Sequence, residues 1–144
     1  MATTTDYRAT GSQAKFIPTG EIVRAVTFTP AAAGLNDIWK VLDVPAGAYI
    51  TDLTLDCGDL DSSTGITLDV GDASTPQRFI AASNVGQAGG IVSASVTGCL
   101  NYQYTAQTNI QIKVHAAATG FQAAAVTLIV RYSMLKGIDV APER

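Results

Sequence analysis

The feature that most constrains this chain is the strict alternation of apolar and polar side chains in several short runs. Residues 109–115 place isoleucine or valine at every second position, with Gln111, Lys113 and His115 between and after them. Successive side chains of a β-strand point to opposite faces, so this spacing is typical of a strand with one buried face. The same alternation predicts strands in three further runs, which are 48–57, 66–70 and 125–134.

The run 48–57 gives the most detailed expectation for a single strand. Its alternation predicts that one face carries Tyr49, Thr51, Leu53, Leu55 and Cys57, and that the other carries Asp52, Thr54 and Asp56. The run follows Pro45-Ala46-Gly47, where Pro presets φ and Gly accepts positive φ. We therefore expect a hairpin that joins the strand in 37–44 to the strand in 48–57.

Four further runs, 22–28, 37–44 and the shorter or weaker 78–82 and 91–97, bring the total to about eight predicted strands. Gly, Pro, Asn and Asp separate them, and 84–90 is expected to be a mobile loop. No stretch of ten or more residues combines a helical apolar stripe with caps. The chain is therefore predicted to be all-β, a two-sheet antiparallel sandwich that is jelly-roll-like.

The expected organisation is an extended N-terminal arm at 1–20, one sandwich domain at 21–134 and a C-terminal tail at 135–144. The arm is rich in Thr, Ser and Gly without a period, which predicts an extended segment and no packed element. An immunoglobulin-like sandwich is the main alternative. No Trp lies between Cys57 and Cys99, where the antibody version of that fold would have one.

Composition argues against nucleic-acid binding and indicates a surface that partner proteins cover. Only 15% of the 144 residues are charged and 47% are apolar, with nine basic and twelve acidic side chains and a net charge of −3. The basic residues are spread singly, whereas nucleic-acid binding needs clusters of them, so no nucleic-acid partner is expected. A surface with so few charges indicates that partner proteins cover part of it.

The sequence predicts neither secretion nor membrane insertion. The first residues lack the basic start and apolar run of a signal peptide, and no stretch approaches the roughly 20 apolar residues that span a bilayer. We therefore expect synthesis and folding in the cytoplasm. Cys57 and Cys99 are interpreted as buried thiols, with a disulfide between them as the alternative.

No residue pattern indicates catalysis, a cofactor or a metal. His115 lies on the polar face of its strand without an orienting partner nearby in sequence, which favours a solvated or interface residue. Asp56, Asp59 and Asp61 are dense enough to suggest Ca²⁺, but their spacing does not match an EF-hand, and the tendency of Asp and Ser to hydrogen-bond the backbone in turns is the preferred explanation. The chain is predicted to have no catalytic, cofactor-binding or metal-binding residues and not to be an enzyme.

Trp39 is the side chain that most indicates a contact surface. Ile38 and Leu42 share one face of the expected strand in 37–44, whereas Trp39 and Val41 make the opposite face apolar as well. Such a strand needs both faces covered, and aromatic residues often dominate protein interfaces. Trp39 and Val41 are therefore predicted interface anchors, and the alternative places Trp39 in the core with Ile38 outward.

The N-terminal arm supplies a second set of predicted interface residues, which are Tyr7, Phe16 and Ile17. Apolar side chains in an unstructured arm need a docking groove. An arm of this kind would become ordered when it contacts its partner.

Three phrases of the sequence, VLDVPAG at 41–47, ITDLTL at 50–55 and ITLDVGD at 66–72, resemble small structural proteins of tailed bacteriophages. Over residues 37–83 the chain is most similar to the jelly-roll-type proteins that decorate or cement capsids. The resemblance implies a virion protein on the capsid surface, made in the host cytoplasm. It also implies a homo-oligomer, usually a trimer, bound between major capsid subunits, and it transfers no individual binding residue.

The functional hypothesis from sequence is therefore a virion structural protein, with capsid decoration preferred over a tail, neck or baseplate role. A carbohydrate-binding jelly roll is the alternative from another class of function. Sugar sites favour exposed aromatic platforms, and only 7% of the residues are aromatic. An exposed Trp39 beside Tyr49, Tyr102 or Tyr104 would favour that alternative.

Overall fold

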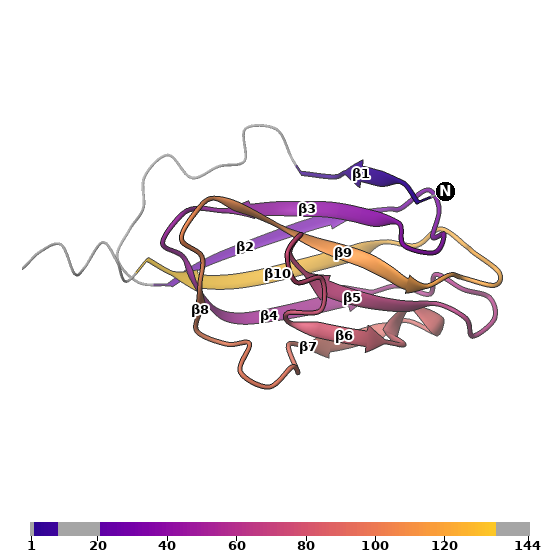
Figure 1. Cartoon of the computed structure of the whole chain (residues 1–144). Helices are drawn as coiled ribbons and strands as arrows, with labels where there is room; N and C mark the ends of the chain where they lie inside the picture. The colour runs from indigo at the N-terminus through magenta and orange to yellow at the C-terminus, as the bar shows by residue number, and fades with distance from the viewer. Residues whose placement is uncertain (1, 9–20, 135–144) are drawn as a thin grey trace, which may run out of the picture.

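The computed structural model describes residues 2–8 and 21–134, which form two facing β-sheets (Figure 1). One sheet has the order β1-β3-β9-β5-β6, and the other has the order β2-β10-β4-β7, with β8 also paired to β4. The first sheet consists of β1 (Thr4–Asp6), β3 (Ile38–Val44), β5 (Thr67–Gly71), β6 (Ile80–Ser83) and β9 (Thr108–Ala116). The second consists of β2 (Glu21–Phe28), β4 (Tyr49–Cys57), β7 (Gly90–Ser93), β8 (Tyr102–Gln103) and β10 (Val126–Ser133).

The strands are wound as a jelly roll. Strands β2, β3, β4 and β5 alternate between the two sheets, and so do β9 and β10. All strand pairs are antiparallel except β1 with β3. The predicted all-β sandwich is confirmed, and the described residues contain two strands beyond the predicted set, β1 and β8.

The core lies between the sheets and is built by the alternating runs. The inward side chains of β9 are Ile110, Ile112 and Val114, and each is fully buried. Those of β10, which are Val126, Leu128, Val130 and Tyr132, are at most 1% exposed. Ile66, Leu68 and Val70 are buried as well.

In the part of the chain described here, no helix has the length and apolarity needed to cross a membrane.

The predicted hairpin between residues 37–44 and 48–57 does not form. Pro45-Ala46-Gly47 is a tight turn, in which the Ala48 amide donates to the Pro45 carbonyl at 3.2 Å and Gly47 has φ of 90°. The turn, however, carries the chain from β3 in one sheet to β4 in the other. Turn chemistry specifies a reversal of direction, and it does not specify which strand the returning chain pairs with.

The buried face predicted for β4 is correct only in its second half. Leu53, Leu55 and Cys57 are buried, but Ile50 is buried in place of Tyr49 and Thr51. The pairing of β4 with β10 shifts register here, so that one extra residue lies between Ile50 and Asp52. A β-bulge of this kind reverses the alternation at a single point.

The N-terminal segment contains a packed element that the sequence did not predict. Residues Thr4–Asp6 form β1, a parallel edge strand on β3. The Asp37 carboxylate fixes its start by accepting hydrogen bonds from the Thr3 amide at 2.9 Å and the Thr3 hydroxyl at 3.1 Å. Further along, the Tyr7 amide donates to the Lys40 carbonyl at 2.8 Å. The expectation of an arm without a packed element therefore fails for this segment, while 9–20 and the tail 135–144 lie outside the described residues.

The region between β6 and β8 also differs from the predicted strands. The expected loop 84–90 contains one turn of 3-10 helix, Val85–Gln87, and the run 91–97 is a strand only as far as Ser93. Beyond it the chain leaves the sheet, because the Ser95 and Val96 amides both donate to the Phe79 carbonyl at 2.9 and 3.2 Å. This crossing ties the two sheets together along one open side of the sandwich.

Candidate assembly surface

The predicted anchors Trp39 and Val41 lie inside the molecule. Trp39 is 2% exposed and contacts Phe28 edge to face at 5.8 Å between ring centroids, and Val41 is fully buried. The register of β3 against β9 shifts between Lys40 and Leu42, so Val41 is the extra residue of a bulge. The bulge explains why both faces of the run are apolar. The structure thus replaces the predicted surface anchors with the core alternative for Trp39.

Of the three residues predicted in the N-terminal arm, the described part includes only Tyr7. Its ring stacks on Phe28 with 4.4 Å between centroids and 23° between ring planes. Tyr7 is partly buried and therefore docks on its own domain. Phe16 and Ile17 lie outside the described residues, so their predicted role stays a prediction.

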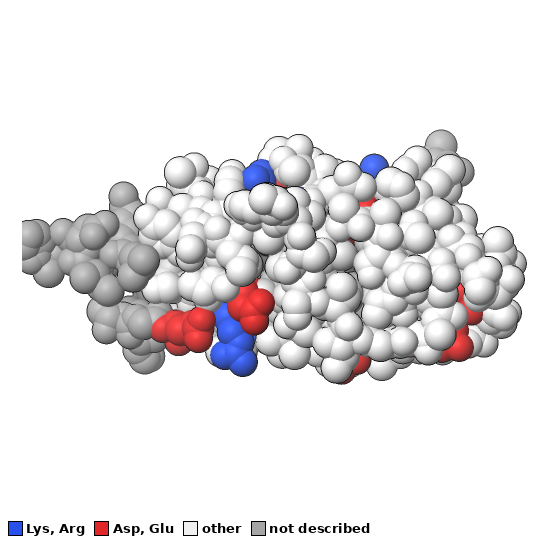
Figure 2. All heavy atoms as spheres, turned by 90° about the horizontal axis from the view of Figure 1, so that it is seen from below, with Lys and Arg blue, Asp and Glu red and all other residues white. Residues whose placement is uncertain are grey.

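A broad surface without charge is the main candidate for assembly. No Asp, Glu, Lys or Arg occurs between Arg78 and Lys113, a stretch that includes β6, β7 and β8. We call the surface formed by residues 79–112 the uncharged side. Figure 2 views the molecule from this direction and shows charged atoms in a group towards one end and near the margins, with a wide uncharged area between them. Few charges need to be desolvated when a partner covers such a surface.

Apolar side chains are exposed on the uncharged side. Ile91 on β7 is 69% exposed, Leu100 is 43% exposed and Tyr102 on β8 is 36% exposed. Single exposed apolar residues are normal, but three within one uncharged stretch match the composition of a protein interface, where charge is depleted and Tyr is enriched. The remaining large exposed apolar residues of the described chain, Val23 and Leu35, belong to other segments.

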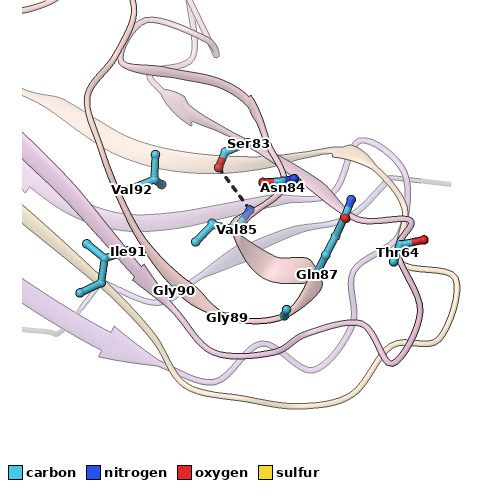
Figure 3. Close-up of a pocket in the computed structure, with 10 residues that line it drawn as sticks. Thr64, Ser83, Asn84, Val85, Gln87, Gly89, Gly90, Ile91 and Val92 are labelled. Atoms are coloured by element: carbon cyan, nitrogen blue, oxygen red, sulfur yellow. Dashed lines mark hydrogen bonds between the residues drawn. The ribbon is translucent and has the colours of Figure 1, made fainter.

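A groove of about 470 Å³ lies on this side, between the segment after β6 and the strand β7 (Figure 3). Its walls carry no charged side chain. They consist of Thr64, Ser83, Asn84, Val85, Gln87, Ala88, Gly89, Gly90, Ile91 and Val92. The Val85 amide donates to the Ser83 hydroxyl at 3.3 Å and holds the turn at the end of the groove. The groove therefore borders the outer edge of β7 and has neither acid nor base for chemistry.

A buried ion pair supports the other end of the uncharged side. Arg78 donates to the Asp72 carboxylate at 2.6 Å, the Tyr104 hydroxyl donates to the same carboxylate at 2.7 Å, and the guanidinium lies 3.8 Å from the Tyr102 ring centroid. Burial alone would raise the pKa of Asp72, but these hydrogen bonds outweigh it and lower the pKa to about 2. The network fixes Tyr102 at the surface.

His115 has an acidic partner that sequence spacing could not reveal. Its Nδ1 lies 3.1 Å from Oδ2 of the buried Asp69, whose other oxygen accepts from the Ala82 amide at 2.7 Å and from Gln77 at 3.1 Å. A cleft of about 380 Å³ beside them is also lined by Ser74. The Ser74 hydroxyl donates to Asp72 at 2.9 Å, so it is not held by the histidine as an activated nucleophile would be.

The acidic loop considered for Ca²⁺ is organised by Asp61. This buried carboxylate accepts hydrogen bonds from the backbone amides of Ser63, Gly65 and Ile66 and, across the loop, from those of Thr119 and Gly120. Within the described residues no three His, Cys, Asp or Glu side chains gather around a possible metal position. The hydrogen bonds within the turn therefore account for the buried carboxylate of Asp61.

Cys57 and Cys99 are both buried free thiols, and burial raises the pKa of Cys57 to about 12.

The uncharged side was not among the predicted sites, because no residue that carries chemistry marks it. The available signal was an absence, the lack of charge from 79 to 112. Leu100 and Tyr102 lie in short or irregular segments without alternation, so periodicity could not place them at the surface. Their exposure follows from the crossing at Phe79 and from the ion pair under Tyr102.

Comparisons with known proteins identify similar folds in phage particles. No protein-family model and no curated protein matches the chain. A chain in the capsid asymmetric unit of cyanophage Pam1 matches with a TM-score of 0.72 and 28% identity, over 88% of this chain and 97% of that one. A chain in the capsid of Ralstonia phage GP4 matches with a TM-score of 0.70 and 28% identity, over 90% and 97%.

A more distant match extends the comparison of the fold. A chain in the acid-stable capsid structure of Helicobacter pylori bacteriophage KHP30 has a TM-score of 0.54 and 14% identity, over 79% of this chain and 91% of that chain. The sandwich described above is thus a fold found in phage capsids, and the first two matches support a virion structural protein.

Proposed function

We propose that this chain is a capsid decoration protein, which binds the outer shell of a phage head and stabilises contacts between the major capsid subunits. The observation that carries the proposal is the similarity to chains in two phage capsid structures, at 28% identity and over 97% of each of those chains. The matches cover 88% and 90% of this chain and 97% of each of those chains. Their correspondence therefore concerns the whole described body rather than one shared motif.

The uncharged side offers a physical basis for attachment. Affinity between proteins comes mainly from a few well-packed apolar or aromatic residues surrounded by contacts that exclude water. Leu100 and Tyr102 are exposed residues of these types, and the Arg78–Asp72 pair holds Tyr102 in place before binding. Because Tyr102 is held in advance, little conformational entropy of its side chain is lost on association. We place the capsid contact at this end of the uncharged side.

The test uses particles that lack the protein. Purified chain added to such shells is expected to bind and to raise the temperature at which they lose their contents. Leu100→Glu places a charge within the proposed contact and is expected to weaken binding by at least about tenfold, since each 1.4 kcal/mol corresponds to that factor. The matched control is Leu35→Glu, because Leu35 is 58% exposed in a different segment.

Four results would contradict the proposal or part of it. Shells that bind no chain, or that bind it without any gain in resistance to heat, would exclude a decorating and stabilising role. Equal binding by the Leu100→Glu and wild-type chains would exclude the proposed contact. Binding to isolated tails, necks or baseplates in place of shells would move the chain to another part of the virion.

The structure does not provide the exposed Trp39 that would favour the carbohydrate-binding alternative. Trp39 is 2% exposed and Tyr104 is 5% exposed, and the guanidinium of Arg78 lies over the ring of Tyr102.

We also infer that the chain is not an enzyme. The Asp69–His115 pair has no hydroxyl or thiol hydrogen-bonded to it within the described residues, and a nucleophile needs such a base.

A further inference from the structure

Two irregularities in the first sheet meet at one buried residue, Asp69. Strands β5 and β9 shift register so that His115 is the extra residue of a β-bulge on β9. Strands β5 and β6 also shift register, so that Ala81 and Ala82 both lie opposite Asp69. Ala82 has φ of 48°, a left-handed conformation that is strained for a residue with a side chain. Bulges and strained residues are common at sites where a functional side chain is aimed at a ligand.

Both irregularities aim hydrogen-bond donors at the Asp69 carboxylate, which is 2% exposed. Its Oδ1 accepts from the Ala82 amide at 2.7 Å and from the Gln77 side chain at 3.1 Å. Its Oδ2 lies 3.1 Å from Nδ1 of His115, and since an ionised carboxylate only accepts, the hydrogen of the neutral ring lies on Nδ1. The other ring nitrogen, Nε2, forms no hydrogen bond within the described residues, and the side chain of His115 is 48% exposed. The fold thus holds His115 by one ring nitrogen and presents the other.

His115 borders a cleft of about 380 Å³ that gathers donors of hydrogen bonds. Lys113 lines the cleft from the same strand and, two positions away, from the same face of the sheet. No hydrogen bond or ion pair engages the Lys113 ammonium in the part of the chain that the structure describes. Thr75 also lines the cleft, and its hydroxyl accepts from Arg78 at 3.1 Å, which leaves its own hydrogen for another acceptor.

The charges around the cleft favour an anion. Asp72, on the segment before β6, is neutralised by Arg78 at 2.6 Å, and β6 itself carries no charge. Asp69 is buried in the wall of the cleft, and the charge of a protonated His115 offsets its own. The charge of Lys113 is then left without a partner within the described residues. We propose that the cleft binds an oxyanion between the Lys113 ammonium and Nε2 of protonated His115.

The single histidine of the chain makes the proposal measurable, because its ring gives one set of NMR signals. The whole chain is titrated with sulfate, which stands for tetrahedral oxyanions, and separately with a short capped peptide that has one glutamate and stands for a protein carboxylate. Sodium chloride keeps the ionic strength constant. At least one probe is expected to shift the His115 signals to saturation. The probe that does so identifies the source of the oxyanion.

Lys113→Gln removes the unpaired charge and should weaken binding by at least about threefold, since a charge-assisted hydrogen bond is lost. Lys40→Gln is the matched control, because it makes the same change in net charge on β3, the neighbouring strand, outside the cleft. Binding should also strengthen as the pH falls from about 8 to about 5.5, because histidine gains its proton in this range and an anion prefers the charged ring. In His115→Gln, followed by calorimetry, this pH dependence should be absent.

The oxyanion proposal is overturned if neither probe shifts the His115 signals to saturation, if Lys113→Gln binds as well as Lys40→Gln, or if wild-type binding is no stronger at about pH 5.5 than at about pH 8. Circular dichroism verifies that each variant is folded. None of these measurements involves shells, so the oxyanion site and the decoration role stand or fall separately.

Discussion

Arg78 is the residue whose loss should cost the most stability at a single contact. Its guanidinium neutralises the Asp72 carboxylate, which is 2% exposed. In Arg78→Ala the carboxylate remains buried without its cation, and breaking such a pair typically costs about 3–5 kcal/mol. Urea unfolding should show this decrease in the free energy of unfolding. Arg131→Ala is the control, because its contact with Glu21 is 3.7 Å long and exposed, and we expect a change within about 1 kcal/mol.

The pH dependence of stability provides a second prediction for the same site. The pKa of Asp72 in the folded protein is about 2, below the ordinary value of 3.8 for an aspartate. The resulting stabilisation is fully present above pH 4 and is lost as the pH falls towards 2, because the unfolded chain binds the proton first. Asp72→Asn should therefore lose less stability than the wild-type protein between pH 4 and pH 2. Parallel curves for the two proteins would show that Asp72 contributes nothing to acid unfolding.

The strand β1 is the element most dependent on one side chain. Asp37 accepts from the Thr3 amide and hydroxyl and also from the Gly34 amide at 2.8 Å. Asp37→Ala should loosen the segment, so that the Ile38 amide, which donates to the Thr3 carbonyl, exchanges with solvent about tenfold faster. Hydrogen exchange measures this directly. The β9 amides and an Asp56→Ala variant should keep wild-type rates, and unchanged exchange at Ile38 would contradict the role of Asp37.

At the same scale, the sequence predicted strand identity better than strand partners. Alternation located β9 and β10 because their inward residues follow one another without interruption. It failed at Thr51 and Val41, where a bulge adds one residue and reverses the inward face. It also misplaced the turn at Pro45-Ala46-Gly47, whose residues determine a reversal but not a change of sheet. Long-range contacts such as Asp69 with His115 leave no local pattern in the sequence.

The whole molecule separates its charges from its proposed contact surface, and this separation predicts how binding responds to salt. Salt weakens contacts between exposed charges, since the Debye length falls from about 10 Å at 0.1 M to 3 Å at 1 M, whereas burial of apolar surface is not screened. The uncharged side contains no Asp, Glu, Lys or Arg, although the chain has a net charge of −3. Binding of the chain to undecorated shells should therefore change by less than about threefold over this range. Calorimetry should also show a negative heat-capacity change, the mark of apolar burial. A steep loss of affinity with salt would instead place the contact on the charged margins, and the Leu100→Glu variant would then bind as well as the wild-type chain.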